Sequence, residues 1–183
     1  MVGFMDMENI LEQVKANKNV PERCYNTALS SDEIFRSIAK VRGMGIEKTS
    51  FEEDMYDHID YYLTYKGIRF PIDIKSSKRT LTFSGDSKDL MEEWVWIELK
   101  NVAGRLGWLY GKAVYIAYIF NNSMWLINRQ KLVDFIAKRV TKTFVSKEEA
   151  GYKLYQRRDR KDVLTLVKLG DIMEDIQPVI VKI

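Results

Sequence analysis

Two acids and one lysine in the stretch of residues 57–78 have the types and spacing to bind a metal. Asp60 lies in one strand-like run, and Asp73 and Lys75 lie two residues apart in the next. Residues i and i+2 of a strand share a face, and pairing of the two runs would bring Asp60 to them. Hard divalent cations prefer carboxylate and carbonyl oxygens. Asp60, Asp73 and the Ile74 carbonyl therefore predict a magnesium site, where Lys75 orients a water or balances charge on a phosphate.

Other arrangements of the acids stay open. An Asp-x-Lys sequence on one strand face is also common as a surface ion pair of little energetic weight. A second alignment takes Asp73 as the first acid and Glu98, two residues before Lys100, as the acid-x-Lys pair. We prefer the first alignment because it needs only a hairpin, and keep Glu98 as an additional catalytic acid. Glu33 and Glu47 are further acids that could complete the metal site.

The composition excludes several rival sites. The chain has 183 residues with one cysteine, Cys24, and one histidine, His58. No intrachain disulfide can form, and a structural zinc site lacks its four N/S ligands. No run is apolar enough for a membrane span, so we expect a cytoplasmic protein. The net charge of +3 is unevenly distributed, because residues 138–161 contain nine Lys/Arg and three Asp/Glu. This basic segment would attract a polyanion.

The hydrophobic pattern predicts the elements that carry these residues. Ser30 and Glu33 fit a capping box that opens a helix over residues 30–42. A loop or short turn over residues 47–54 leads to the two runs, which flank a Lys66-Gly67 turn. Strand parity places His58 on the face of Asp60. The later expected elements are strands over 93–100, 113–120, 124–128 and 163–169, helices over 130–140 and 170–175, and an exposed turn over 156–161.

The acid-bearing run followed by Pro71-Ile-Asp-Ile-Lys75 resembles the PD-(D/E)XK nuclease superfamily. Its members fold as a helix, a mixed sheet and a second helix, and they cut DNA or RNA with magnesium. The resemblance covers roughly residues 30–135. It implies an α/β fold with a restriction-endonuclease-like core, a mixed central β-sheet flanked by helices. Carried over, Asp60 and Asp73 match the metal-binding acids and Lys75 the catalytic lysine. Residues 96–101 with 107–111 are similar to small phage-encoded members.

These observations predict a single nuclease-like domain over residues 1–183. Its core spans about 30–136, with a helical extension over 1–29 and a basic C-terminal segment over 138–183. The expected activity is Mg²⁺-dependent hydrolysis of DNA phosphodiester bonds, with Mn²⁺ able to substitute, by an endonuclease in a bacterial or phage-infected cell. The alternative is a non-cleaving nucleic-acid-binding or protein-interaction module.

We expect DNA as partner and no membrane, with a homodimer left open. Basic side chains beyond the Asp-x-Lys strand and in the basic segment are predicted to meet phosphate. They are Lys78, Arg79, Arg157, Arg158, Arg160 and Lys161. The substrate structure and its sequence are not predicted.

Overall fold

The computed structural model describes residues 31–76, 93–120 and 123–182. The chain folds into two compact units: unit 1 holds residues 1–76, 113–127 and 178–183, and unit 2 holds 77–112 and 128–177. The predicted helical extension lies outside the described residues, as do Lys78 and Arg79. The single domain over residues 1–183 stays a prediction.

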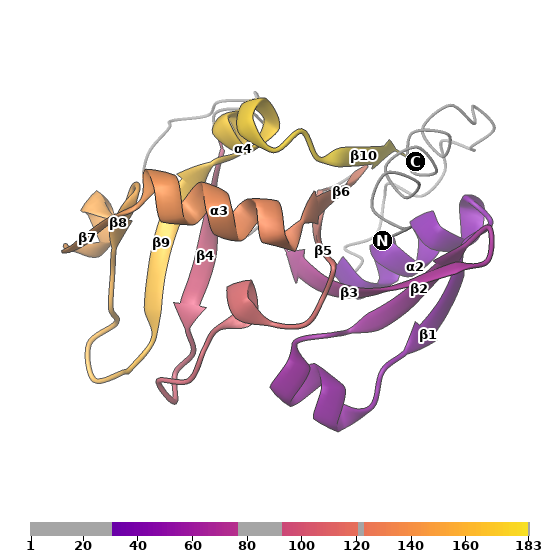
Figure 1. Cartoon of the computed structure of the whole chain (residues 1–183), viewed down its shortest axis with the longest axis horizontal. Helices are drawn as coiled ribbons and strands as arrows, with labels where there is room; N and C mark the ends of the chain where they lie inside the picture. Colours follow the sequence, from indigo (N-terminus) through magenta and orange to yellow (C-terminus); the bar gives the residue numbers. More distant parts are fainter. Residues whose placement is uncertain (1–30, 77–92, 121–122, 183) are drawn as a thin grey trace. The chain divides into compact units, whose positions relative to one another are not determined.

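A six-stranded mixed sheet forms unit 1, in the order β1-β2-β3-β5-β6-β10. The first three strands form an antiparallel meander, β5 runs parallel to β3, and β10 closes the other edge against β6 (Figure 1). The bounds are Gly45–Lys48 for β1, Tyr61–Tyr65 for β2, Ile68–Ser76 for β3, Tyr115–Phe120 for β5, Ser123–Asn128 for β6 and Val179–Lys182 for β10. The predicted fold, a mixed central sheet flanked by helices, is confirmed.

The tight turn at Lys66-Gly67 fixes the register of β2 against β3. Both residues have positive φ, 48° and 79°, the combination that type I′ hairpin turns require. Tyr65 consequently pairs with Ile68. The predicted hairpin is therefore confirmed, with Asp73 on the longer strand extending past the start of β2.

The parallel pairing of β3 with β5 joins segments that are far apart in sequence. Asp73 is in register with Ile116, and Lys75 with Tyr118. A parallel pair needs a crossover connection, and here residues 77–112, which belong to unit 2, provide it. The next strand along the chain, β4 (Trp94–Lys100), is thus left out of the six-stranded sheet.

Helix α2 (Ser31–Val41) covers one face of this sheet (Figure 1). Its apolar side chains Phe35 and Ile38 are buried against strand residues that include Leu63 and Ile72, as the 3.6-residue period predicts. The chain leaves the helix at Gly43, whose φ of +66° suits a glycine at this position. Alternate residues of β3 thereby enter the core, while Asp73 and Lys75 project from the opposite face.

Two predictions between α2 and β2 are wrong. A loop or short turn was expected from residue 47, but residues 47 and 48 belong to edge strand β1 (Gly45–Lys48), all of whose residues are exposed. The first run is also not a regular strand from residue 57. Glu53–Asp57 form a π-helical turn, and β2 begins only at Tyr61. An exposed edge strand such as β1 shows no alternation of apolar and polar residues from which it could be predicted. The acidic residues around positions 52–57 are common in turns and in helices alike.

Unit 2 contains two small sheets and two helices. Strand β4 pairs antiparallel with β9 (Val163–Lys168), and β7 (Thr141–Phe144) pairs with β8 (Lys153–Leu154). Helices α3 (Arg129–Arg139) and α4 (Leu169–Asp175) complete it. Strands β4 and β9 and helices α3 and α4 confirm the elements predicted for this region, whereas β7 and β8 were not predicted. Among the described residues, no helix is long and apolar enough to cross a membrane.

Candidate metal-binding site

Asp73 and Lys75 form the centre of the candidate site on β3. The Lys75 ammonium donates to Asp73 Oδ1 at 2.6 Å, as their spacing in one strand predicts. The Asp73 side chain is 3% exposed and that of Lys75 is 25% exposed. This is a mostly buried pair rather than the surface ion pair of the alternative interpretation, and a buried charge needs compensation that a solvated one does not.

Asp60 reaches this pair from the residue before β2. Its backbone N–H donates to the Ile72 carbonyl at 2.8 Å, and its carboxylate Oδ2 accepts the backbone N–H of Ile74 at 2.6 Å. The Thr49 hydroxyl lies 2.5 Å from the Ile59 carbonyl and 3.0 Å from that of Asp60, and holds the segment from the β1 side. We call Asp60, Asp73 and Lys75 the acid–lysine site.

The strand-parity argument for His58 is wrong. His58 has a left-handed backbone conformation, with a φ of 54°, at the end of the π-helical turn. The chain therefore does not alternate regularly between His58 and Asp60, and the parity rule does not apply to them. The turn instead redirects the chain so that Asp60 meets the edge of β3.

The two carboxyl groups of the site influence each other electrostatically. Burial raises the pKa of Asp73 to about 7; the Lys75 charge opposes the rise, and the charge of Asp60 and a hydrogen bond with it add to the rise. Asp73 Oδ2 is buried with no donor among the described residues. Two facing carboxylates repel unless a proton or a cation lies between them. The site therefore favours a bound positive charge.

Two residues that the sequence did not single out border the site. Lys48 on β1 places its ammonium 3.9 Å from Asp60 Oδ1, so a second lysine faces the acids. Tyr118 on β5 is buried in register with Lys75, and burial together with the Asp73 charge raises the pKa of its hydroxyl. Finding either from sequence requires the pairing of β1 with β2 and of β3 with β5, which local patterns do not give.

The residues present fit a magnesium ion. The described residues contain no cluster of three or more His, Cys, Asp or Glu side chains that could hold a metal, but magnesium commonly uses only one or two carboxylates and keeps several waters. Asp60 and Asp73 supply that number. The Ile74 carbonyl is also well oriented, because its N–H points to Asp60 and the N–H and C=O of a strand residue point to the same edge. The buried oxygen of Asp73 that lacks a donor supports the same fit.

The other candidate acids are carried by other elements. Glu98 is on β4, which pairs with β9 and belongs to unit 2. Glu47 is on β1 and forms an ion pair at 3.0 Å with Arg69, with its side chain 67% exposed. Glu33 is in the exposed part of the first turn of α2. Within unit 1, the structure thus brings together only Asp60 and Asp73 of the predicted acids.

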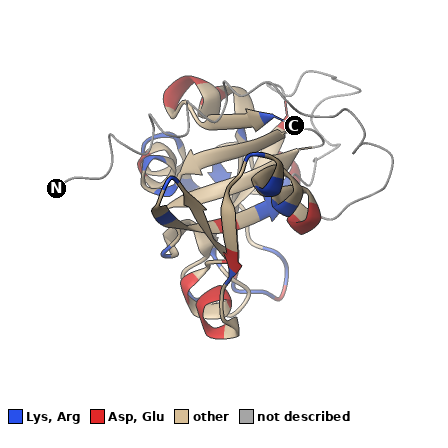
Figure 2. Ribbon diagram, turned by 90° about the vertical axis from the view of Figure 1, so that its right-hand side faces the viewer, with Lys and Arg blue, Asp and Glu red and all other residues tan. Residues whose placement is uncertain are grey.

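The predicted phosphate-binding residues differ in their surroundings. Arg157 forms an ion pair with Asp162, which is fully buried, so this arginine has a structural partner. Arg158, Arg160 and Lys161 are exposed, as expected for the predicted turn. Basic and acidic residues are interspersed over the ribbon, with the acidic π-helical turn at the lower end of the view (Figure 2). The exposed cations Arg158, Arg160 and Lys161 therefore form a basic turn within unit 2.

Comparison with known proteins adds no assignment. No protein-family model, no curated protein and no solved structure matches the chain.

Proposed function

We propose that this protein is a magnesium-dependent nuclease that hydrolyses DNA phosphodiester bonds, with the acid–lysine site as its catalytic centre. The observation that carries the proposal is the meeting of Asp60 and Asp73 beside the Lys75 ammonium. Two carboxyl groups and a lysine held together in a mostly buried position cost stability unless they bind something. Perturbed acids of this kind concentrate at functional sites.

Asp60 and Asp73 would hold the metal, with the Ile74 carbonyl as a third ligand. A bound Mg²⁺ supplies charge stabilisation to the phosphate and lowers the pKa of a coordinated water. Lys75 is fixed by Asp73 at 2.6 Å and so orients a nucleophilic water or neutralises charge that develops on the phosphate. Lys48 on β1 lies 3.9 Å from Asp60 Oδ1 and adds positive potential for an anionic substrate.

The topology supports the first of the two alignments. Unit 1 begins with a helix and a three-stranded meander, and its next strand lies parallel to the third. This order accords with the helix and mixed sheet that the PD-(D/E)XK resemblance implies. Asp60 and Asp73 lie at neighbouring strands of one sheet, whereas the strand that carries Glu98 and Lys100 does not pair with β3. We therefore retain Asp60, Asp73 and Lys75 as catalytic residues.

Incubation of the protein with plasmid, linear and branched DNA, with Mg²⁺, Mn²⁺ or chelator, tests the proposal. We expect metal-dependent products that disappear in both Asp73→Ala and Lys75→Ala. Asp175→Asn, which breaks the surface ion pair with Arg139, is the matched control and should cut normally. Products that are identical for wild type and Asp73→Ala would refute the enzyme. Metal-independent DNA binding without cleavage would favour the non-cleaving module.

A further inference from the structure

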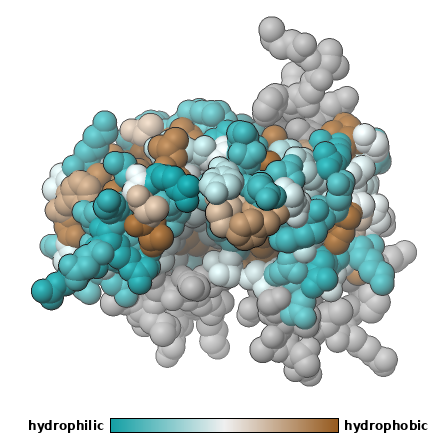
Figure 3. Space-filling view, turned by 90° about the horizontal axis from the view of Figure 1, so that it is seen from below, coloured by the Kyte–Doolittle hydropathy of each residue, from teal (hydrophilic) through white to brown (hydrophobic). Residues whose placement is uncertain are grey.

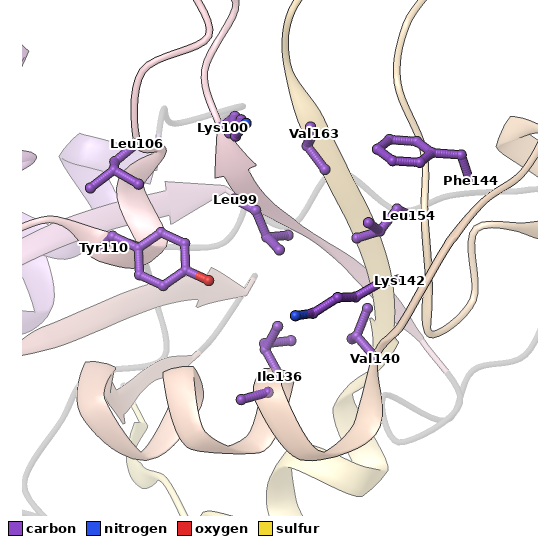
Figure 4. Close-up of a pocket in the computed structure, with 11 residues that line it drawn as sticks. Leu99, Lys100, Leu106, Tyr110, Ile136, Val140, Lys142, Phe144, Leu154 and Val163 are labelled. Carbon is purple, nitrogen blue, oxygen red and sulfur yellow. The ribbon is translucent and has the colours of Figure 1, made fainter.

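Unit 2 contains a pocket that the proposed catalysis does not use. Its volume is about 520 Å³, within the usual range of about 300–1,000 Å³ for small-ligand sites. The walls are aliphatic side chains from four elements, among them Leu99 of β4, Ile136 of α3, Leu154 of β8 and Val163 of β9 (Figure 4). Such walls favour a ligand with a flat or apolar body.

Large apolar side chains stay exposed around this pocket. Phe144 is 57% exposed, Leu106 63% and Tyr110 40%, and all three line it. Exposed apolar groups gathered at one place mark binding surfaces more often than scattered ones do. On the face seen from below, apolar patches interrupt a largely hydrophilic surface (Figure 3). The two aromatic rings offer flat surfaces against which a planar group can stack.

The charged side chains that line the pocket in the described part of the chain are cations. Lys100 and Lys142 line it, and no Asp or Glu of the described residues does. Figure 4 shows the Lys142 ammonium and the Tyr110 hydroxyl both pointing into the cavity. Among the described residues, no carboxylate forms an ion pair with Lys142. The lining therefore complements an anion with an apolar or aromatic body.

Further cations lie beside the pocket. A side-chain carbon added at Gly104 would lie 3.2 Å from Lys161, so the loop after β4 contacts the exposed basic turn before β9. Arg105 and Leu106 follow in the same loop, and Leu106 lines the pocket. Several cations in succession suit a chain of phosphates better than the single head group of a fatty acid.

We infer that this pocket binds an unpaired nucleotide of single-stranded DNA. One base would stack on Phe144 or Tyr110 above the aliphatic walls, and its phosphates would lie on Lys100, Lys142 and Lys161. Exposed aromatic rings next to a row of cations are how proteins hold single strands without reading sequence. A base that is still paired and stacked in a duplex cannot present its face to the pocket.

The inference rests on the proposed DNA substrate and specifies it as DNA with unpaired bases. Its test is equilibrium binding without metal, so that cleavage does not enter. The probes are fluorescein-labelled oligothymidylate and a duplex of matched length, measured by fluorescence anisotropy. We expect wild type to bind the single strand more tightly than the duplex.

The variants are chosen in matched pairs. Phe144→Ala should weaken single-strand binding about 5- to 150-fold, the range for loss of one stacked base, and leave duplex binding nearly unchanged. Its control is Phe51→Ala, since Phe51 is 68% exposed in unit 1. Lys142→Gln should weaken single-strand binding and reduce the salt slope by about 0.7. Its control is Lys153→Gln, an exposed lysine on β8 outside the lining.

The outcomes separate this inference from the proposed catalysis. Single-strand binding that depends on Phe144 in a protein that cuts nothing would support the pocket and refute the nuclease. Metal-dependent cleavage with single-strand binding indifferent to Phe144→Ala and Lys142→Gln would overturn the pocket alone. Equal affinity of wild type for single strand and duplex would also overturn it.

Discussion

The Ile74 backbone N–H donates to Asp60 Oδ2 at 2.6 Å, which ties the residue before β2 to the middle of β3. Asp60 is thus held by the main chain of the residue that separates Asp73 from Lys75. This bond orients the carboxylate without using a second side chain. The backbone pairing of the hairpin therefore sets the position of the Asp60 carboxylate relative to Asp73.

The first prediction concerns the pH dependence of stability. The pKa of Asp73 is raised from 3.8 to about 7 by burial, so between about pH 4 and 7 the folded state keeps a proton that the unfolded chain has lost. The free energy of unfolding should therefore fall as pH rises through this window and stay level on either side. At about 1.4 kcal/mol per pKa unit, the fall is at most about 4 kcal/mol.

Asp73→Asn removes this titration and should flatten the dependence, with the variant more stable than wild type at pH 8. Urea denaturation in chelator from pH 4 to 8 measures it, and Asp175→Asn should retain the wild-type slope. Parallel curves for wild type and Asp73→Asn across the window would show that Asp73 is ionised in the folded protein.

The second prediction concerns metal binding. At pH 7.5, Mn²⁺ should raise the melting temperature of wild type, and chelator should reverse the rise. An Mn²⁺ concentration of about 100 times its dissociation constant raises the free energy of unfolding by about 2.7 kcal/mol. This gain raises the melting temperature by about 5 °C or more. Asp60→Asn should abolish the shift because it removes a ligand, whereas Asp175→Asn should retain it. A full shift in Asp60→Asn would place the metal elsewhere.

The third prediction separates the two lysines. Lys75→Gln should lower the single-turnover cleavage rate about 100- to 1,000-fold at saturating Mn²⁺, the range for loss of one preorganised electrostatic group. Lys48→Gln should lower it less than about 10-fold, because its ammonium is 3.9 Å from Asp60 and its side chain is 52% exposed. Equal losses of cleavage rate in the two variants would contradict the catalytic role proposed for Lys75.

The fourth prediction concerns Thr49 as a positioning residue. Thr49→Val removes the hydroxyl that bonds the carbonyls of Ile59 and Asp60, which should cost about 1 kcal/mol of stability. The affinity for Mn²⁺ should weaken several-fold, as measured by titration, because Asp60 loses support. Thr141→Val, which removes a 3.3 Å bond to the Tyr152 carbonyl, should destabilise without changing the metal affinity. A purely structural role for Thr49 would leave metal affinity unchanged in both.

The centre of the site could be predicted from sequence because it depends on local geometry. The turn at Lys66-Gly67 and the spacing of Asp73 and Lys75 each follow from a few residues, and the structure confirms both. Helix α2 likewise follows from its periodic apolar face. These features need no knowledge of distant parts of the chain.

The surroundings of the site could not be predicted because they depend on pairing across long separations. Tyr118 borders Asp73 only through the parallel register of β5 with β3. Lys48 reaches Asp60 from a strand whose four residues are exposed and therefore show no alternation. That β4 pairs with β9 and not with β3 also depends on the connection between β3 and β5. The sequence alone therefore could not decide between the two alignments of the acids.

The outermost strand of the six-stranded sheet also constrains the order of folding. Strand β10 covers the edge of β6, yet residues 129–178 separate these strands along the chain. A ribosome adding about 5–20 residues per second exposes the β6 edge for some seconds before its neighbour exists. Val179 and Val181 are then the residues that seal it, so nascent chains stalled before them should be prone to pair with one another through that edge.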